Sequence, residues 1–280
     1  MPSFTEFYRE TLHLFFDPVQ DPTIRRLLLL SSLGESGPQA PRLSLEFKEL
    51  GIIHLLVLSG SQVQFFAGSL RFLILKIVPV AWSALWKTWI LRVILGSGLW
   101  VFGATTLWQA PLTRALLTES FRLFIPGLRW VWVWMLGFLS QACLFPHHLR
   151  EPGFYLSWAA SLGLKWAQEF TWNPWLGLVG VSVLSQALLG IIKGVPDLSL
   201  EQWLLILLAN LCVGSLFERT LMRGIGWVLA LGYLVSLFLP MAGWGAELWN
   251  GIGFFLRPAL EGSSTLVLVA LRAFRYIQWL

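Results

Sequence analysis

Long apolar segments recur along this chain of 280 residues, and they constrain its fold more than any other feature. The segments are residues 65–80, 89–108, 129–145, 175–192, 203–217 and 226–244. A helix that crosses the hydrocarbon core of a bilayer needs roughly 20 mostly apolar residues. We therefore expect an all-α, polytopic transmembrane helix bundle of about six to eight spans, with short amphipathic or interfacial helices.

The composition supports the membrane class and leaves the partner open. Hydrophobic residues make up 56% of the chain and charged residues 12%, whereas globular domains average about 45–50% and about 25%. Seventeen tryptophans fit a membrane protein, because indole rings favour the membrane–water interface. A net charge of +5 is compatible with phosphate-bearing partners and equally with the Lys/Arg-rich loops that orient membrane proteins.

The chain divides into three expected regions. Residues 1–49 should form N-terminal amphipathic or interfacial helices and a loop, with the first helix on the membrane surface or against the bundle. Asp21-Pro22-Thr23 is a typical helix start, and Gly34 a typical end. Residues 50–245 should form the main membrane domain. Residues 246–280 should form an amphipathic or membrane-spanning tail.

A cluster of polar residues interrupts the apolar character of residues 50–70. Within six positions the chain carries Ser59, Gly60, Ser61, Gln62 and Gln64. Such groups are costly at membrane depth unless they are buried against protein or face water. Two interpretations remain open: a substrate path at a softened helix, or a helix–helix contact in which small residues let backbones approach.

This stretch also resembles the signature of the ComEC-type competence proteins, which are bacterial membrane channels for single-stranded DNA. The matching residues are Gly51, His54, Leu55, Leu56, Ser59, Gly60 and Val63. Gln62 stands where the family carries a second histidine, and Ser61 stands where it carries a leucine.

Three further blocks are similar to family motifs in the family's order. They are Arg114-Ala115, residues 152–164, and Ala209-Asn210-Leu211 followed by Glu218 and Arg219. Thr118 replaces a methionine in the first of these blocks, and Tyr155 replaces a glutamine in the second. The resemblance covers roughly residues 24–220 and implies that residues 50–245 are a competence membrane domain.

A polar stripe on one helix suits a phosphodiester backbone. Arg114, Thr118 and Arg122 lie at i, i+4 and i+8, hence on one helical face. Guanidinium groups donate paired hydrogen bonds to phosphates without reading base identity. The alternatives are an interfacial helix with snorkelling arginines, or an ion pair between Arg114 and a buried acid such as Glu218.

We expect no metal, no cofactor and no enzymatic activity. The adjacent His147 and His148 do not make a zinc site on their own. Cys143 and Cys212 lie inside apolar segments and resemble small buried hydrophobes. Full-length members of the resembled family add an OB-like domain and a metallo-β-lactamase-like nuclease domain. We expect the bare membrane core here, because the hydrophilic stretch at residues 34–49 is too short for the first and no metal-ligand motif indicates the second.

The resemblance implies passage of single-stranded DNA through a protein-lined path in the bacterial cytoplasmic (inner) membrane. Expected partners are single-stranded DNA, the lipid bilayer, and separate uptake proteins that act as DNA receptor, driving ATPase and nuclease. The candidate path residues are His54, Ser59, Gly60, Ser61, Gln62, Gln64, Arg114, Thr118, Arg122 and Asn210. The alternatives are a transporter of a smaller or lipid-like solute, which the loss of the signature histidine favours, and a non-transporting scaffold. Membrane orientation and oligomeric state stay open.

Overall fold

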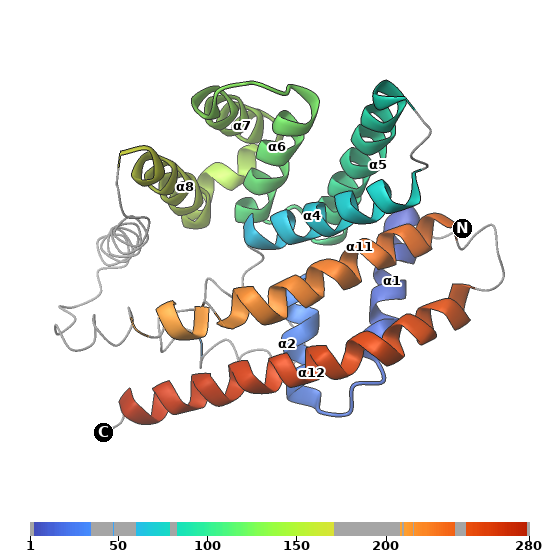
Figure 1. The fold of residues 1–280 in the computed structure, drawn as a ribbon. Coiled ribbons are helices and arrows are strands. Elements are labelled where there is room, and N and C mark those ends of the chain that lie inside the picture. The colour runs from blue at the N-terminus through green and yellow to red at the C-terminus, as the bar shows by residue number, and fades with distance from the viewer. Residues whose placement is uncertain are drawn as a thin grey trace.

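The computed structural model describes residues 3–34, 47, 60–78, 83–170, 208, 210–214, 216–238 and 245–278, and every regular element within them is a helix (Figure 1). The α-helices are α1 (Phe4–Phe16), α2 (Pro22–Leu33), α4 (Gly60–Ile77), α5 (Ala84–Thr105), α6 (Ala110–Phe124), α7 (Trp130–Leu144), α8 (Pro152–Phe170), α11 (Arg223–Phe238) and α12 (Gly245–Gln278). Short elements are the 3₁₀ helix η2 (Pro146–Arg150) and the π-helices η3 (Asn210–Gly214) and η4 (Phe217–Met222). The expected all-α class is confirmed for this part of the chain.

Local sequence signals set the ends of the second helix. The Asp21 side chain accepts hydrogen bonds from the backbone N–H groups of Thr23 and Ile24, and Pro22 occupies the first helical position. These choices satisfy free N–H groups at a helix start. Gly34 ends α2 in the left-handed region, with φ 70°. The predicted start and end of this helix are therefore confirmed.

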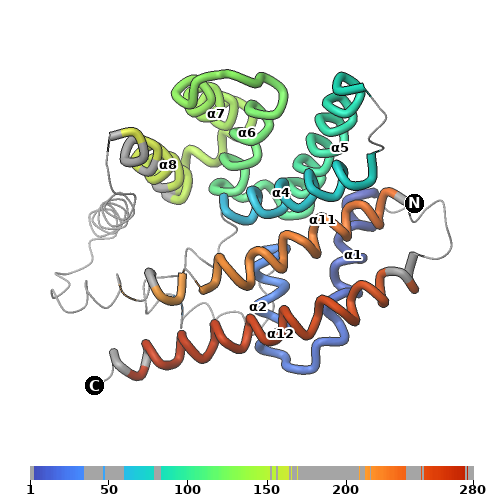
Figure 2. The backbone as a smooth tube through the Cα atoms, viewed as in Figure 1, coloured from blue at the N-terminus to red at the C-terminus, as the bar shows by residue number. Residues whose placement is uncertain are grey.

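Helices α4 and α11 lie side by side and form the centre of the molecule (Figure 2). Gly226 on α11 faces the backbone of Phe65 on α4, where an added Cβ would lie 2.9 Å from the Phe65 carbonyl carbon. The glycine lets the two helices approach closely. Phe66, Phe102 and Tyr233 then pack together in a buried aromatic cluster that joins α4, α5 and α11.

The N-terminal helix packs inside the bundle. Tyr8, Leu12, Phe15 and Phe16 are fully buried, and the Tyr8 hydroxyl donates a hydrogen bond to the Leu229 carbonyl at 2.9 Å. Of the two placements left open by its amphipathic pattern, the structure shows the one against the bundle.

Within the described part of the chain, three helices are long and apolar enough to cross a membrane: Ala84–Thr105, Cys212–Leu237 and Trp249–Phe274. The first agrees with the span predicted at residues 89–108. The third lies in the tail, for which spanning was one of two possibilities. The predicted span at residues 129–145 is the apolar helix α7, which is shorter than a full span. The predicted span at residues 175–192 lies outside the described residues, and so does part of the one predicted at residues 203–217.

Candidate functional site

The four blocks that resemble family motifs meet at one place in the fold. We call this place the motif junction and define it by Gly60, Ser61, Arg114, Ser157, Trp158 and Glu218. Gly60 begins α4, Arg114 lies on α6, Ser157 and Trp158 lie on α8, and Glu218 lies on η4. Residues separated by up to 158 positions in sequence are thereby brought together, since 218 − 60 = 158.

Arg114 is held at the junction from three sides. Its Nε donates a hydrogen bond to the Ser157 hydroxyl at 2.6 Å, and its guanidinium lies 5.8 Å from the ring centroid of Trp158. This separation is typical of a cation–π contact. A Cβ added at Gly60 would lie 3.0 Å from Arg114 Nη2. Glycine at the start of α4 therefore leaves room for the guanidinium.

The two charged residues of the junction do not pair with each other in the described structure. Ser61 hydrogen-bonds the Glu218 carboxyl, and no carboxylate among the described residues forms a salt bridge with Arg114. An ion pair between Arg114 and Glu218 was one of the alternatives raised by the sequence. Instead, Arg114 bonds the Ser157 hydroxyl and Glu218 bonds the Ser61 hydroxyl.

A buried amide behind Arg114 fixes the neighbouring helices. The Gln141 Oε1 accepts the indole N–H of Trp158 at 2.9 Å, and its Nε2 donates to the Ala110 carbonyl at 2.8 Å. Gln141 Nε2 also lies 3.0 Å from His148 Nδ1. Because the first two bonds identify the oxygen and the nitrogen of the amide, Nδ1 must be the acceptor in the third. The amide thus joins α6, α7, η2 and α8.

This hydrogen bond also bears on a cluster of potential metal ligands. His147, His148 and Glu151 bring ligand atoms within 4.8 Å of one another. With Nδ1 accepting from Gln141, the neutral His148 ring carries its proton on Nε2, so neither nitrogen offers a free lone pair. Burial lowers the pKa of His148, although the charge of Glu151 opposes this effect. The arrangement is typical of a structural histidine rather than a ligand.

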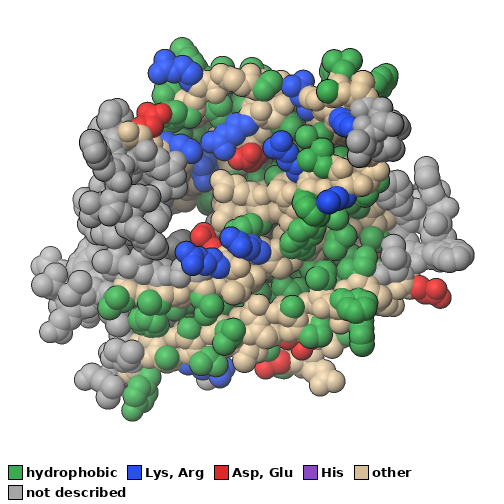
Figure 3. Space-filling model, in the orientation of Figure 1, with side chains coloured by type: hydrophobic (Ala, Val, Ile, Leu, Met, Phe, Trp, Pro, Cys, Tyr) green, Lys and Arg blue, Asp and Glu red, His purple; other side chains and the backbone are tan. Residues whose placement is uncertain are grey.

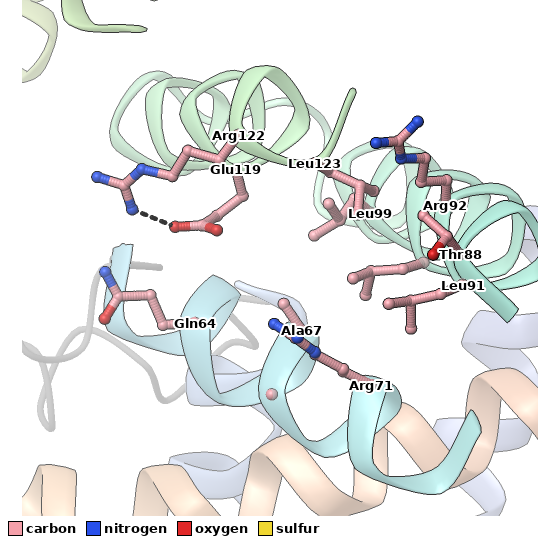
Figure 4. A pocket seen from close by; sticks show the side chains of 12 residues that line it. Gln64, Ala67, Arg71, Thr88, Leu91, Arg92, Leu99, Glu119, Arg122 and Leu123 are labelled. Carbon is pink, nitrogen blue, oxygen red and sulfur yellow. Dashed lines mark hydrogen bonds and ion pairs between the residues drawn. The ribbon is translucent and has the colours of Figure 1, made fainter. Parts of the chain in front are cut away.

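A groove of about 380 Å³ lies between α4, α5 and α6, beside the junction (Figure 4). Its lining residues are Gln64, Ala67, Gly68, Arg71, Thr88, Leu91, Arg92, Leu95, Leu99, Glu119, Arg122 and Leu123. We call it the arginine groove, because three of its residues are arginines and one is an acid. Basic side chains gather around acidic ones on this face of the molecule (Figure 3).

The three arginines are spread along the groove. Figure 4 shows Arg122 above Gln64 at one end, Arg71 rising from α4 in the middle, and Arg92 on α5 at the other end. Arg122 Nη1 lies 2.8 Å from Glu119 Oε1. Arg71 and Arg92 have no hydrogen-bond or ion-pair partner among the described residues. Leucines from α5 and α6 supply the apolar part of the lining.

The candidate path residues therefore separate into distinct environments. Gln64 and Arg122 line the groove, whereas Gly60, Ser61 and Arg114 belong to the junction. Gln62 is 1% exposed, and its Nε2 donates to the Ser31 carbonyl at 2.7 Å.

Four further candidates are less informative. The Thr118 hydroxyl bonds back to the Arg114 carbonyl of its own helix. His54 and Ser59 lie outside the described residues, and so does the side chain of Asn210 at the start of η3.

Arg71 and Arg92 line the groove but were not among the predicted path residues, although a feature of the sequence indicates each of them. Arg71 follows Gln64 by seven positions, which places both on one face of α4. Arg92 is a charged residue inside an otherwise apolar segment, and such residues mark functional sites in membrane proteins. The contact between α4, α5 and α6 was needed to relate them to Arg122.

Comparison with known proteins identifies a family. A family model described as Competence protein matches residues 32–280. No curated protein and no solved structure matches the chain. The matched range includes the whole motif junction and the whole arginine groove.

Proposed function

The chain belongs to the Competence protein family, and from this membership we propose that it is a multi-pass channel through which single-stranded DNA crosses the bacterial cytoplasmic membrane during natural competence. Such a channel would use the described candidate spans. The total of about six to eight expected from the sequence would also need the shorter described helices and the span predicted at residues 175–192. The same proposal includes separate proteins that receive the DNA, drive it and degrade the other strand.

The observation that carries this proposal is the arginine groove. Arg71, Arg92 and Arg122 lie along its length instead of converging on one point (Figure 4). Spaced guanidinium groups suit an extended polyanion, since each can bind one phosphate without reading the base beside it. A compact anionic solute would be held better by convergent charges. The layout therefore favours a strand over the smaller solute that was considered as an alternative.

The rest of the groove is compatible with a nucleotide chain. The leucines of α5 and α6 offer an apolar surface to sugars and bases, while Gln64 adds a neutral hydrogen-bonding group at one end. Arg71 and Arg92 have no partner to give up among the described residues before they contact a phosphate. Passage through such a groove is passive, because these groups only replace the water around the phosphates. The driving force must come from elsewhere.

The motif junction has a supporting role in this proposal. It ties the start of α4 to α6 and α8 through Gly60, Arg114 and Ser157. The same two helices, α4 and α6, form two walls of the groove. We therefore assign Arg114 to positioning and Arg122 to phosphate contact.

The test replaces all three groove arginines with glutamine and measures uptake of labelled DNA into the cytosol per molecule of channel. We expect a loss of at least about tenfold, since each hydrogen bond to a charged group contributes about 1.5–3 kcal/mol. Lysine at the three positions should restore uptake only in part, because it keeps the charge and loses the paired donors.

A matched control removes the same charge elsewhere. Arg129, Arg150 and Arg272 are exposed and lie outside the groove, so their triple glutamine variant should take up DNA normally. Equal uptake per molecule in the two triple variants would refute the groove as the DNA path.

A further inference from the structure

We propose that Glu119 is a built-in competitor of DNA for Arg122, which keeps the strand weakly held so that it can move on. This inference rests on the proposed DNA path, and it assigns a role to the one acid among the groove's lining residues. With three arginines and one glutamate, the lining carries a formal charge of 3 − 1 = +2.

The geometry places Glu119 where it can make this exchange. Glu119 and Arg122 are three residues apart on α6, and their charged atoms lie 2.8 Å apart. The side chains are 24% and 40% exposed, so both can be reached from the groove. Figure 4 shows Glu119 projecting from α6 towards α4, with its carboxylate inside the groove.

The energetics favour an exchangeable pair over a permanent one. Partly exposed ion pairs contribute little, about 0–1 kcal/mol, so an incoming phosphate can displace the carboxylate at small cost. Conduction requires binding that is favourable enough to enter and weak enough to leave. After the phosphate departs, the ion pair between Glu119 and Arg122 can form again. Arg71 and Arg92 have no such competitor among the described residues, which confines this control to one end of the groove.

A purely structural role for the pair predicts different behaviour. Side-chain pairs at this spacing stabilise a helix by about 0.2–0.5 kcal/mol. If that were the whole role of Glu119, its removal would slightly loosen α6 and weaken or leave unchanged the binding of DNA. Competition for Arg122 predicts tighter binding instead. The two roles therefore predict opposite changes in DNA affinity when the Glu119 carboxylate is removed.

The experiment measures binding of a fluorescent oligothymidylate of about twelve nucleotides to the full chain in phosphatidylcholine nanodiscs at several salt concentrations. Glu119→Gln should tighten binding several-fold to about tenfold. The slope of log K against log salt should steepen by about 0.7, because Arg122 becomes free for one more phosphate. Uptake in cells should slow as the strand leaves less easily. Glu119→Asp retains the charge and should bind more weakly than Glu119→Gln.

Two controls isolate the competition. Glu247→Gln removes an exposed acid outside the groove and should leave binding unchanged. In an Arg122→Gln background, Glu119→Gln should have little further effect. An equal gain in that background would show a general effect of charge and overturn the inference.

The outcomes separate this inference from the function on which it rests. If the unmodified chain binds the oligonucleotide and Glu119→Gln binds it no better, Glu119 is not a competitor and the DNA path stands. If neither protein binds it at any salt concentration, the proposed path itself fails. Thermal unfolding of each variant shows whether a loss of binding comes from misfolding.

Discussion

Two consecutive residues between α5 and α6 adopt a backbone conformation that L-amino acids rarely take. Leu107 and Trp108 have φ values of 55° and 51°. The Trp108 N–H donates to the Gly103 carbonyl at 2.9 Å, and the Thr113 hydroxyl donates to the Trp108 carbonyl at 2.8 Å. These bonds close a tight turn and determine where α6 begins, one turn before Arg114.

The strain at the first of these positions should be removable. Leu107 is 76% exposed, so Leu107→Gly loses little packing while it removes a steric cost of about 1–2 kcal/mol. The greater chain entropy of unfolded glycine offsets about 0.5–1 kcal/mol of this gain. We expect a net stabilisation of roughly 0.5–1 kcal/mol, measured by thermal unfolding in detergent. Trp108→Gly should destabilise, because the indole packs against Gly103 and Phe145. A lower unfolding temperature for Leu107→Gly would contradict this account.

Single residues also show what the sequence could and could not predict about the site. The candidate Arg122 was found from a polar stripe on one helical face, and Gln64 from polar groups that interrupt an apolar segment; both line the groove. Gln62 carried the same signal but lies buried against the Ser31 carbonyl. Polarity within an apolar segment indicates that a partner exists. It does not distinguish a neighbouring helix from a solvent path, because that depends on tertiary packing.

At the scale of elements, the crossing of α4 and α11 depends on backbone contact. An added Cβ at Gly226 would lie 2.7 Å from Phe65 Cβ, 2.9 Å from its carbonyl carbon and 3.1 Å from its carbonyl oxygen. A flexible side chain could move away from such a contact, whereas the backbone of a helix cannot move alone. The whole of α4 would have to shift, and with it one wall of the groove.

Gly226→Ala should therefore destabilise the protein by about 1–3 kcal/mol, the usual cost of overpacking. Gly262→Ala is the matched control, since a Cβ at that helical position on α12 meets nothing within 4 Å. It should be neutral or stabilise by up to about 1 kcal/mol through helix propensity. Thermal unfolding of the two variants in the same detergent makes the comparison. Similar unfolding temperatures would show that α4 and α11 are not in close contact.

Elements with strong local signals were predictable, and those that depend on packing were not. Asp21, Pro22 and Gly34 fixed α2, because caps act within one turn. The long apolar run at residues 89–108 indicated α5, although the helix begins earlier, at Ala84. The first helix was ambiguous, because an amphipathic pattern describes a membrane surface and a bundle interior equally well.

At the scale of the whole molecule, the first and the last helix of the chain are joined. Helix α1 packs against α11 and α12, and two side chains of α12 donate to its backbone. Trp249 Nε1 bonds the Thr11 carbonyl at 2.7 Å, and Arg257 Nε bonds the Phe15 carbonyl at 2.7 Å. The family match begins at residue 32, yet α1 is part of the same hydrophobic core. The matched region thus depends on a helix that precedes it.

Truncating buried side chains of α1 tests this dependence. Leu12→Ala should destabilise the protein by about 2–5 kcal/mol, because Leu12 is fully buried between α1 and α11 and its loss leaves a cavity. Leu14→Ala, two positions along the same helix, should change stability by less than about 0.5 kcal/mol, since Leu14 is 55% exposed. The measurement is thermal unfolding in detergent. A helix lying on the membrane surface would turn Leu12 towards lipid and away from α11, so its truncation would cost little. Equal and small effects at both positions would indicate that α1 lies on the membrane surface and is not part of the core.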